Sequence, residues 1–237
     1  MTVSLKNLFT VAALSSLSAG ILLTLIQQFQ VVPAIIEAES YEQSPAVEHG
    51  ASESGHVHAH TESDHAHDDS AWAPQDGLQR TLFTAGANIV IALGFALLIG
   101  AATVLRGITL NWRTGLLWGL AGYAVFFVAP SLGLHPELPG TAAADLQSRQ
   151  YWWLATIACS AVGLALLVFS PRVVLKILGG LLILLPHVVG APLPDVHSAL
   201  APADLIQRFI IATIIANAVF WLALGGLYGF FQQKLVH

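Results

Sequence analysis

The sequence has few charged residues and almost no cysteine. Only 10% of its 237 residues are Asp, Glu, Lys or Arg, whereas soluble domains carry about 25%. The single cysteine, Cys159, excludes an internal disulfide and any cluster of thiolate metal ligands. The sequence also lacks a Walker-type phosphate loop, a dinucleotide fingerprint and the basic, aromatic-rich patch typical of nucleic-acid binding. These absences argue against a soluble domain, a nucleotide-dependent protein and a nucleic-acid-binding protein.

In place of a charged surface the sequence has long apolar runs. Hydrophobic residues make up 55% of the chain, and an α-helix needs about 20 predominantly apolar residues to span a bilayer. Six apolar runs can be distinguished, at about residues 8–26, 81–105, 114–134, 151–170, 173–191 and 209–231. The pattern predicts an all-α, polytopic membrane helix bundle in which residues 1–237 form a single transmembrane domain.

Two of these runs allow more than one interpretation. The first follows Lys6 and contains small residues, as a secretory signal peptide would, but it continues through Ile26, past any cleavage site of that kind. We therefore favour an uncleaved first span. The fifth run is short and carries Pro186 and His187, which is compatible with a broken or re-entrant helix. Six spans are favoured, and five spans are the alternative.

The basic residues form two unequal groups when the six-span topology is assumed. Those on the side of the two termini are Lys6, Arg106, Arg113, Arg172, Lys176 and Lys234. Those on the other side are Arg80, Arg149 and Arg208. Because loops rich in Lys and Arg stay in the cytoplasm, both termini are predicted to be cytoplasmic. In a Gram-negative bacterium this makes the chain a multi-pass inner-membrane protein whose first loop lies in the periplasm.

A short motif recurs where the three inward-running spans begin. Each has an aspartate and an arginine four residues apart, at Asp76 and Arg80, Asp145 and Arg149, and Asp204 and Arg208. On a helix this spacing puts both side chains on one face within pairing distance. Each outward span also has a proline near its outer end, at Pro33, Pro130 and Pro186. The recurrence predicts three two-helix units in a parallel, pseudo-threefold arrangement; interface anchors and helix caps are the alternative explanation.

The most unusual segment lies between the first and second spans. Residues 43–72 form a loop rich in His, Asp and Glu, which lacks the apolar residues needed to pack a core and is predicted to be disordered. Its histidines are His49, His56, His58, His60, His65 and His67. Imidazole together with carboxylates suits borderline divalent metals such as cobalt, nickel and zinc. We interpret the loop as a collector that raises the local concentration of metal ions without selecting one metal.

Further potential metal ligands are expected near the outer ends of the helices. These candidates are Glu37, Glu39, His135, Glu137, His187 and His197. His187 is the sharpest of them because an ionisable group inside an apolar run is a functional candidate by default. Its alternative role is a hydrogen bond to backbone freed by the adjacent proline. His135 and His197 have the alternative of being ordinary solvated loop histidines.

Several stretches taken together resemble the CbtA-type family of proposed cobalt transporter subunits. They are QQFQVVP at 27–33, EAESYE at 37–42, the histidine-rich loop, AWAPQDGLQR at 71–80, LWGLAG at 117–122, APSLGLHPELPG at 129–140, RQYWWLA at 149–155 and LPHVVGAP at 185–192. The resemblance covers nearly the whole chain. It implies cobalt uptake connected with cobalamin synthesis and a small, single-span, histidine-bearing partner of the CbtB type. It also implies five spans, whereas the distribution of basic residues favours six.

The sequence therefore predicts a membrane transporter subunit for a divalent transition metal, with Co²⁺ as the first candidate, and not an enzyme. The bilayer and the CbtB-type subunit are the expected partners, a homo-oligomer is compatible with the sequence, and no nucleotide is expected. A nickel or zinc transporter is one alternative, because the ligand types do not separate these metals. The other is a metal-binding membrane scaffold that delivers ions without transporting them.

Overall fold

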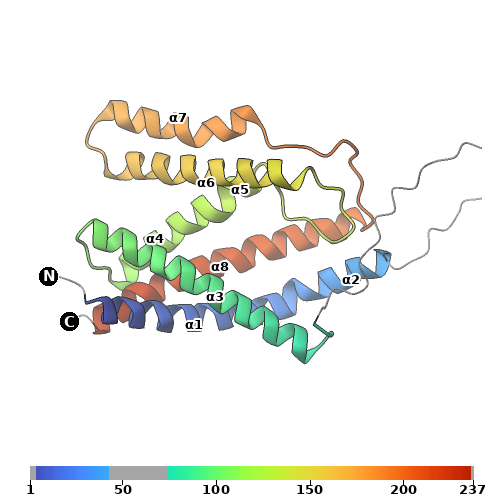
Figure 1. Ribbon diagram of the computed structural model, residues 1–237, viewed down its shortest axis with the longest axis horizontal. Coiled ribbons are helices and arrows are strands. Elements are labelled where there is room, and N and C mark those ends of the chain that lie inside the picture. Colours follow the sequence, from blue (N-terminus) through green and yellow to red (C-terminus); the bar gives the residue numbers. More distant parts are fainter. Residues whose placement is uncertain (1–3, 43–73, 236–237) are drawn as a thin grey trace, which may run out of the picture.

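The computed structural model describes residues 4–42 and 74–235. The predicted loop at 43–72, with its six histidines, lies outside the described residues. Within these two stretches the chain is helical and contains no β-strand, so the all-α prediction is confirmed. The helices are α1 (Leu5–Gln30), α2 (Val32–Glu42), α3 (Leu78–Leu105), α4 (Trp112–Tyr123), the π-helix η1 (Ala124–Val128), α5 (Ala129–Ser131), α6 (Leu146–Phe169), α7 (Val173–Val189) and α8 (Ala203–Leu235) (Figure 1).

Five helical segments in the described residues are long and apolar enough to cross a membrane. They are α1, α3, the continuous segment Trp112–Ser131, α6 and α8. α7 is apolar but has only 17 residues, which is about 25 Å of helix against a hydrocarbon core of about 30 Å. Because α7 includes Pro186, the short fifth run of the sequence forms one continuous helix and is not broken at the proline. By length, the described chain has five candidate spans and one shorter apolar helix.

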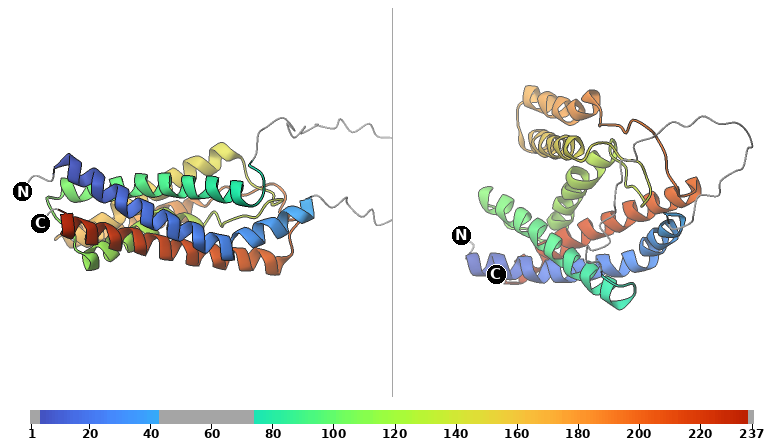
Figure 2. Two further views of the ribbon diagram at one scale, coloured as in Figure 1. Left: turned by 90° about the horizontal axis from the view of Figure 1, so that it is seen from below. Right: turned by 45° about the vertical axis from the view of Figure 1, so that its right-hand side comes forward.

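The path of the chain places both of its described ends at the same end of the bundle. α7 runs antiparallel to α6 and returns the chain to the end at which α8 begins (Figure 1), and the views in Figure 2 agree. We call the end where α2 stops and α3, α6 and α8 start the loop end. The chain termini lie at the opposite end of the bundle.

Two groups of helices can be distinguished by their packing. α1 packs against α3 and α8, and α4 packs along α8, so these four helices share one core. In that core the ring of Phe95 lies 5.0 Å from Phe126 and 4.5 Å from Trp221, centroid to centroid. Leu224 and Tyr228 of α8 are 0% and 1% exposed. α6 packs mainly against α7 instead, and Figure 1 shows this pair beside the other helices.

Glycines bring the helix backbones close together in both groups. A Cβ atom added to Gly119 of α4 would overlap the carbonyl oxygen of Trp221 in α8. In the other group, a Cβ on Gly163 of α6 would lie 2.6 Å from the carbonyl oxygen of Gly179 in α7. Small residues have this role in membrane bundles because lipid tails are as apolar as leucine, so helices associate through close packing.

The three prolines of the outward segments have different local effects. Pro33 is the second residue of α2, where a missing backbone N–H costs nothing, so the acidic stretch that follows α1 is itself helical. Pro130 follows the π-helix η1, a form that commonly marks a distortion within a longer helix. Pro186 lies inside the last turn of α7. The shared proline is therefore a feature of sequence rather than of one common geometry.

The helices of the three predicted units also have different neighbours. α1 packs on α3, the second helix of its own unit. α7 packs instead on α6, which belongs to the preceding unit, while α8 packs on α1 and α4. The parallel threefold arrangement stays a prediction.

Candidate functional site

Each arginine at the start of an inward helix forms an ion pair with a glutamate at the loop end. Arg80 contacts Glu39 at 2.6 Å between Nη2 and Oε1. The other two pairs are Arg149 with Glu137 at 2.8 Å and Arg208 with Glu37 at 3.5 Å. The three glutamates predicted from sequence to be metal ligands are thus all held by arginines.

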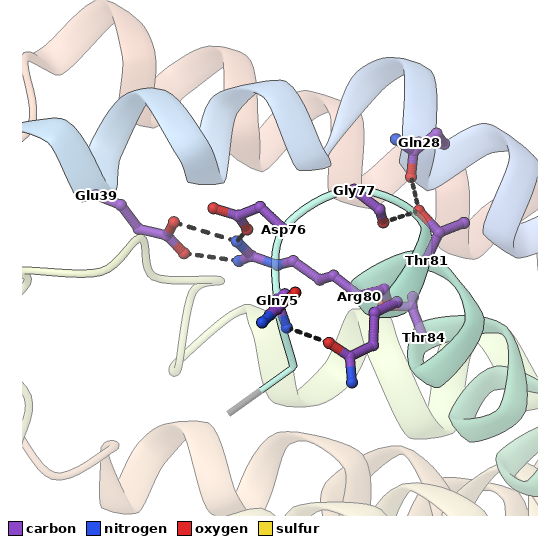
Figure 3. A network of polar contacts seen from close by, with 9 residues as sticks. Gln28, Glu39, Gln75, Asp76, Gly77, Arg80, Thr81 and Thr84 are labelled. Carbon is purple, nitrogen blue, oxygen red and sulfur yellow. Dashed lines mark hydrogen bonds and ion pairs between the residues drawn. The ribbon is translucent and has the colours of Figure 1, made fainter. Parts of the chain in front are cut away.

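The Arg80 pair is the most completely bonded of the three (Figure 3). The guanidinium donates two hydrogen bonds to Glu39 and a third, at 2.8 Å, to Asp76 in the turn that precedes α3. Next to it, the Thr81 hydroxyl lies 3.2 Å from the side-chain oxygen of Gln28. These contacts tie α1 and α2 to the first turn of α3. They therefore join α2 and α3, the helices that precede and follow the histidine-rich segment in the sequence.

Two of the three expected aspartate–arginine pairs within a helix are formed. They are Asp76 with Arg80 at 2.8 Å and Asp204 with Arg208 at 3.3 Å. Asp145 instead caps α6, because its carboxylate accepts a 2.8 Å hydrogen bond from the backbone N–H of Ser148. This bond lowers the pKa of Asp145 below its ordinary value. Arg149 therefore turns to Glu137, which precedes α6 in the connecting loop.

The two loops at this end are joined to each other by their backbones. The N–H of Ala142 donates to Ser198 at 2.9 Å, and the N–H of Leu200 donates to Gly140 at 3.2 Å. Between them Thr141 and Ala199 form an isolated antiparallel bridge. The loop from α5 to α6 and the loop from α7 to α8 are consequently held side by side, although they are far apart in sequence.

A cavity of about 410 Å³, which we call the interloop pocket, lies between these two loops. Its polar lining includes His135, Glu137 and Arg149 from the first loop and the start of α6, and His197 from the second loop. A neighbouring cavity of about 230 Å³ is lined in part by Asp145 and Asp195. Three of the six outer candidates, His135, Glu137 and His197, therefore lie around one pocket, whereas Glu37, Glu39 and His187 are not in its lining.

His187 lies behind this pocket rather than in its lining. Its ring packs edge-on against Trp152, with 5.8 Å between centroids, and the Trp152 indole N–H donates to the carbonyl of Pro186 at 3.1 Å. On its other side, Trp152 fills the space in which a Cβ of Gly133, a pocket residue, would lie. Trp152, which the sequence reasoning did not select, thus lies against both His187 and the pocket residue Gly133.

The expected alternative role for His187, a hydrogen bond to nearby backbone, is not what the structure records. The Pro186 carbonyl accepts from Trp152 and from the N–H of Gly190, at 3.1 and 3.0 Å. The Nε2 atom of His187 is buried and has no hydrogen-bond partner among the described residues. Burying a nitrogen without a hydrogen-bond partner costs folding free energy. A ligand that bound to His187 Nε2 would offset this cost.

No ready-made metal cluster is present in residues 4–42 and 74–235, where no three His, Cys, Asp or Glu side chains are close enough to hold one ion. Glu37 and Glu39 lie on α2 at a different position from the interloop pocket. The arginine partners could have been suspected from charge balance, because three basic residues at an otherwise acidic end need counter-charges. Nothing in the sequence indicated which glutamate each would choose.

A family model described as a probable cobalt transporter subunit (CbtA) matches residues 5–233, which is nearly the whole chain. Neither the curated proteins nor the solved structures gave a match to it.

Proposed function

The chain belongs to the family of probable cobalt transporter subunits, and from that premise we propose that it carries a divalent transition metal, Co²⁺ first, into the cell. The observation that carries this proposal is the family match over residues 5–233 of an apolar helical bundle with five candidate spans. The metal ion is the cargo, and we propose neither an enzymatic reaction nor a bound nucleotide. The word subunit implies a partner protein, for which a small, single-span, histidine-bearing protein of the CbtB type is our candidate.

We propose that the loop end faces the periplasm and that both termini are cytoplasmic. The basic residues at the end of the termini outnumber those at the loop end, in keeping with the bias of cytoplasmic loops toward Lys and Arg. The loop-end arginines are moreover neutralised by glutamates. The inner membrane of a Gram-negative cell is the location that follows.

We propose that the histidine-rich segment captures the ion before the bundle takes it up. This segment connects α2 to α3, so it is tethered at the loop end beside Glu37 and Glu39. The next proposed ligands are His135, Glu137 and His197 in the interloop pocket. His187, with its unpartnered Nε2, follows behind Trp152.

Deleting residues 48–69 tests the role of the segment as a collector. Uptake should fall when the metal is scarce and recover when it is in excess, because a collector changes local concentration and not the pathway. A variant with the six histidines replaced by serine is the matched control for segment length. Loss of uptake at every concentration in both variants would contradict a mere collecting role.

External pH provides a second test of histidine ligands. Protonated imidazole cannot bind a metal, so uptake should fall as the external pH drops below about 6. The measurement is initial uptake by cells at a constant proton gradient. A steady rise in uptake down to pH 5 would contradict histidine-dependent capture.

Flux measured in proteoliposomes separates the candidate functions. Radiolabelled Co²⁺ uptake is measured with and without the single-span partner, and Ni²⁺ and Zn²⁺ are added as competitors. Uptake that excess Ni²⁺ blocks poorly supports a cobalt-selective transporter, and strong competition supports a nickel or zinc transporter. Tight binding without flux in either preparation supports a scaffold.

A further inference from the structure

We propose that Arg149 is a built-in competitor for the metal ion in the interloop pocket, so that an ion binds Glu137 only in exchange for the arginine. This inference rests on the proposed metal transport and concerns how one of its sites is regulated. It starts from the 2.8 Å contact between Arg149 Nη2 and Glu137 Oε2, both of which line the pocket.

The Arg149 pair differs from the other two arginine pairs in its number of carboxylates. Arg80 is held by Glu39 and Asp76, and Arg208 by Glu37 and Asp204. Arg149 is paired with Glu137, because Asp145 is engaged at the start of α6. Fewer carboxylate contacts are broken when Arg149 leaves Glu137 than when Arg80 leaves its two partners, so the Arg149 pair is easier to exchange than the Arg80 pair.

The Arg149 pair is also the one that borders the pocket. Its side chains are 27% and 32% exposed, so an ion entering the pocket can reach the carboxylate. Two further ligand types, His135 and His197, line the same cavity. Two imidazoles and a carboxylate form a set that suits a borderline divalent metal.

Electrostatics requires that the two cations exclude each other. Arg149 and Glu137 together carry no net charge, so a divalent ion beside the intact pair would gain little from the carboxylate and would lie a few ångströms from the positive guanidinium. Repulsion at that distance is strong in a partly buried site. In the metal-free pocket Arg149 therefore repels other cations. A metal ion can bind Glu137 only after Arg149 has moved away from it.

Such competition has a use in transport. An ion has to bind well enough to enter a site and weakly enough to leave it. When Arg149 returns to Glu137 it replaces the ion with an internal cation, so the ion can be released without the carboxylate becoming unpaired. In the arginine-bound structure no three His, Cys, Asp or Glu side chains of the described residues are close enough to hold one ion, so binding requires the pocket ligands to move together when Arg149 leaves.

The test uses full-length protein in which the six loop histidines are replaced by serine, so that the loop does not mask the pocket. Co²⁺ alone is the probe, and its visible absorption reports binding to imidazole and carboxylate. Arg149→Gln should tighten Co²⁺ binding by roughly three- to tenfold because it removes a competing charge. Glu137→Gln should weaken binding by a similar factor, and the double variant should bind like Glu137→Gln.

Two further variants control for charge and for folding. Arg149→Lys keeps the competing cation and should bind Co²⁺ close to the parent value. Arg113→Gln removes an arginine at the start of α4 that does not line the pocket, and it should leave binding unchanged. Thermal unfolding in detergent identifies any variant that does not fold.

The outcomes separate this inference from the proposed function. If Arg149→Gln folds but binds Co²⁺ no tighter than the parent, Arg149 is only a structural ion-pair partner and the inference is wrong. Absence of Co²⁺ binding by the folded parent would overturn it as well. Co²⁺ flux by the native chain is measured separately. Flux without tighter binding in Arg149→Gln would support transport and contradict the exchange, and tighter binding without flux would support the exchange and contradict transport.

Discussion

The α4–α8 contact and the α6–α7 contact are both built on glycines, but their surroundings differ. α4 and α8 share a core with α1, α3 and a group of buried aromatic rings. α6 and α7 pack on each other, and their contacts with the other described helices are few. The first contact therefore belongs to a body of four helices, whereas the second holds together a pair that joins this body largely through α5, η1 and the loops.

This difference explains where the candidate site lies. The interloop pocket is formed by the loop that enters the pair and the loop that leaves it, and the second of these leads to α8. Its shape therefore depends on how the α6–α7 pair sits relative to the four-helix body. A substitution inside the α6–α7 pair should alter the pocket without unfolding the four-helix body. A substitution inside the body should destabilise both the body and the pair.

The largest effect is expected from Gly119→Leu in the α4–α8 contact. Its side chain would collide with the backbone of α8, which cannot move without disturbing the shared core. We expect the free energy of unfolding to decrease by more than ~3 kcal/mol, the upper end of ordinary overpacking. The yield of folded protein in detergent should therefore fall sharply. Gly94→Leu on α3, where an added Cβ meets nothing within 4 Å, is the matched control and should fold normally.

A smaller and more local effect is expected from Gly163→Leu in the α6–α7 contact. The close approach to Gly179 would be lost, at a cost of about 1–3 kcal/mol. The pair should separate and become sensitive to protease while the four-helix body stays folded. Gly180→Ala, at a position with open space, should leave the protease pattern unchanged. Global unfolding by Gly163→Leu would mean that the two regions are not independent.

Trp152→Phe should have a moderate effect at the point where the pair meets the pocket. It keeps most of the apolar ring but removes the indole hydrogen bond to Pro186, which should cost about 1 kcal/mol. The measurement is the thermal unfolding midpoint. Trp153→Phe, at an exposed neighbouring position, should shift that midpoint by less. Equal shifts in the two variants would argue that the hydrogen bond contributes nothing.

The smallest effect is expected where α2 meets α3, on the side of the four-helix body. A double-mutant cycle with Arg80→Gln and Glu39→Gln should give a coupling free energy of about 1 kcal/mol or less, because both side chains are 29% exposed. The coupling should decrease further in high salt. A coupling that is several times larger and insensitive to salt would show that the pair is effectively buried.

Much of the helical framework could be predicted from the sequence. The apolar runs favoured six spans, with five as the alternative; five helices reach spanning length, and the run that contains Pro186 is shorter, as expected. The sequence analysis assigned no helix to residues 32–42, although Ala and Glu favour helix and Pro33 occupies a position that tolerates it. His135, Glu137 and His197 were among the ligand candidates expected near the outer ends of the helices, but only the structure shows that they line one pocket and that an arginine pairs with Glu137.

The sequence by itself determined that the chain is an all-helical, apolar bundle, because the length and hydropathy of each run depend only on local composition. It also determined which ligand types are available, since these are simply the side chains present. Only the tertiary structure decided that Arg149 turns to Glu137, that Trp152 packs against His187, and that the bundle divides into a body and a pair. Ion pairs and helix contacts join residues far apart in sequence, and many partners of equal charge or size compete for each position until the backbone places one of them within reach.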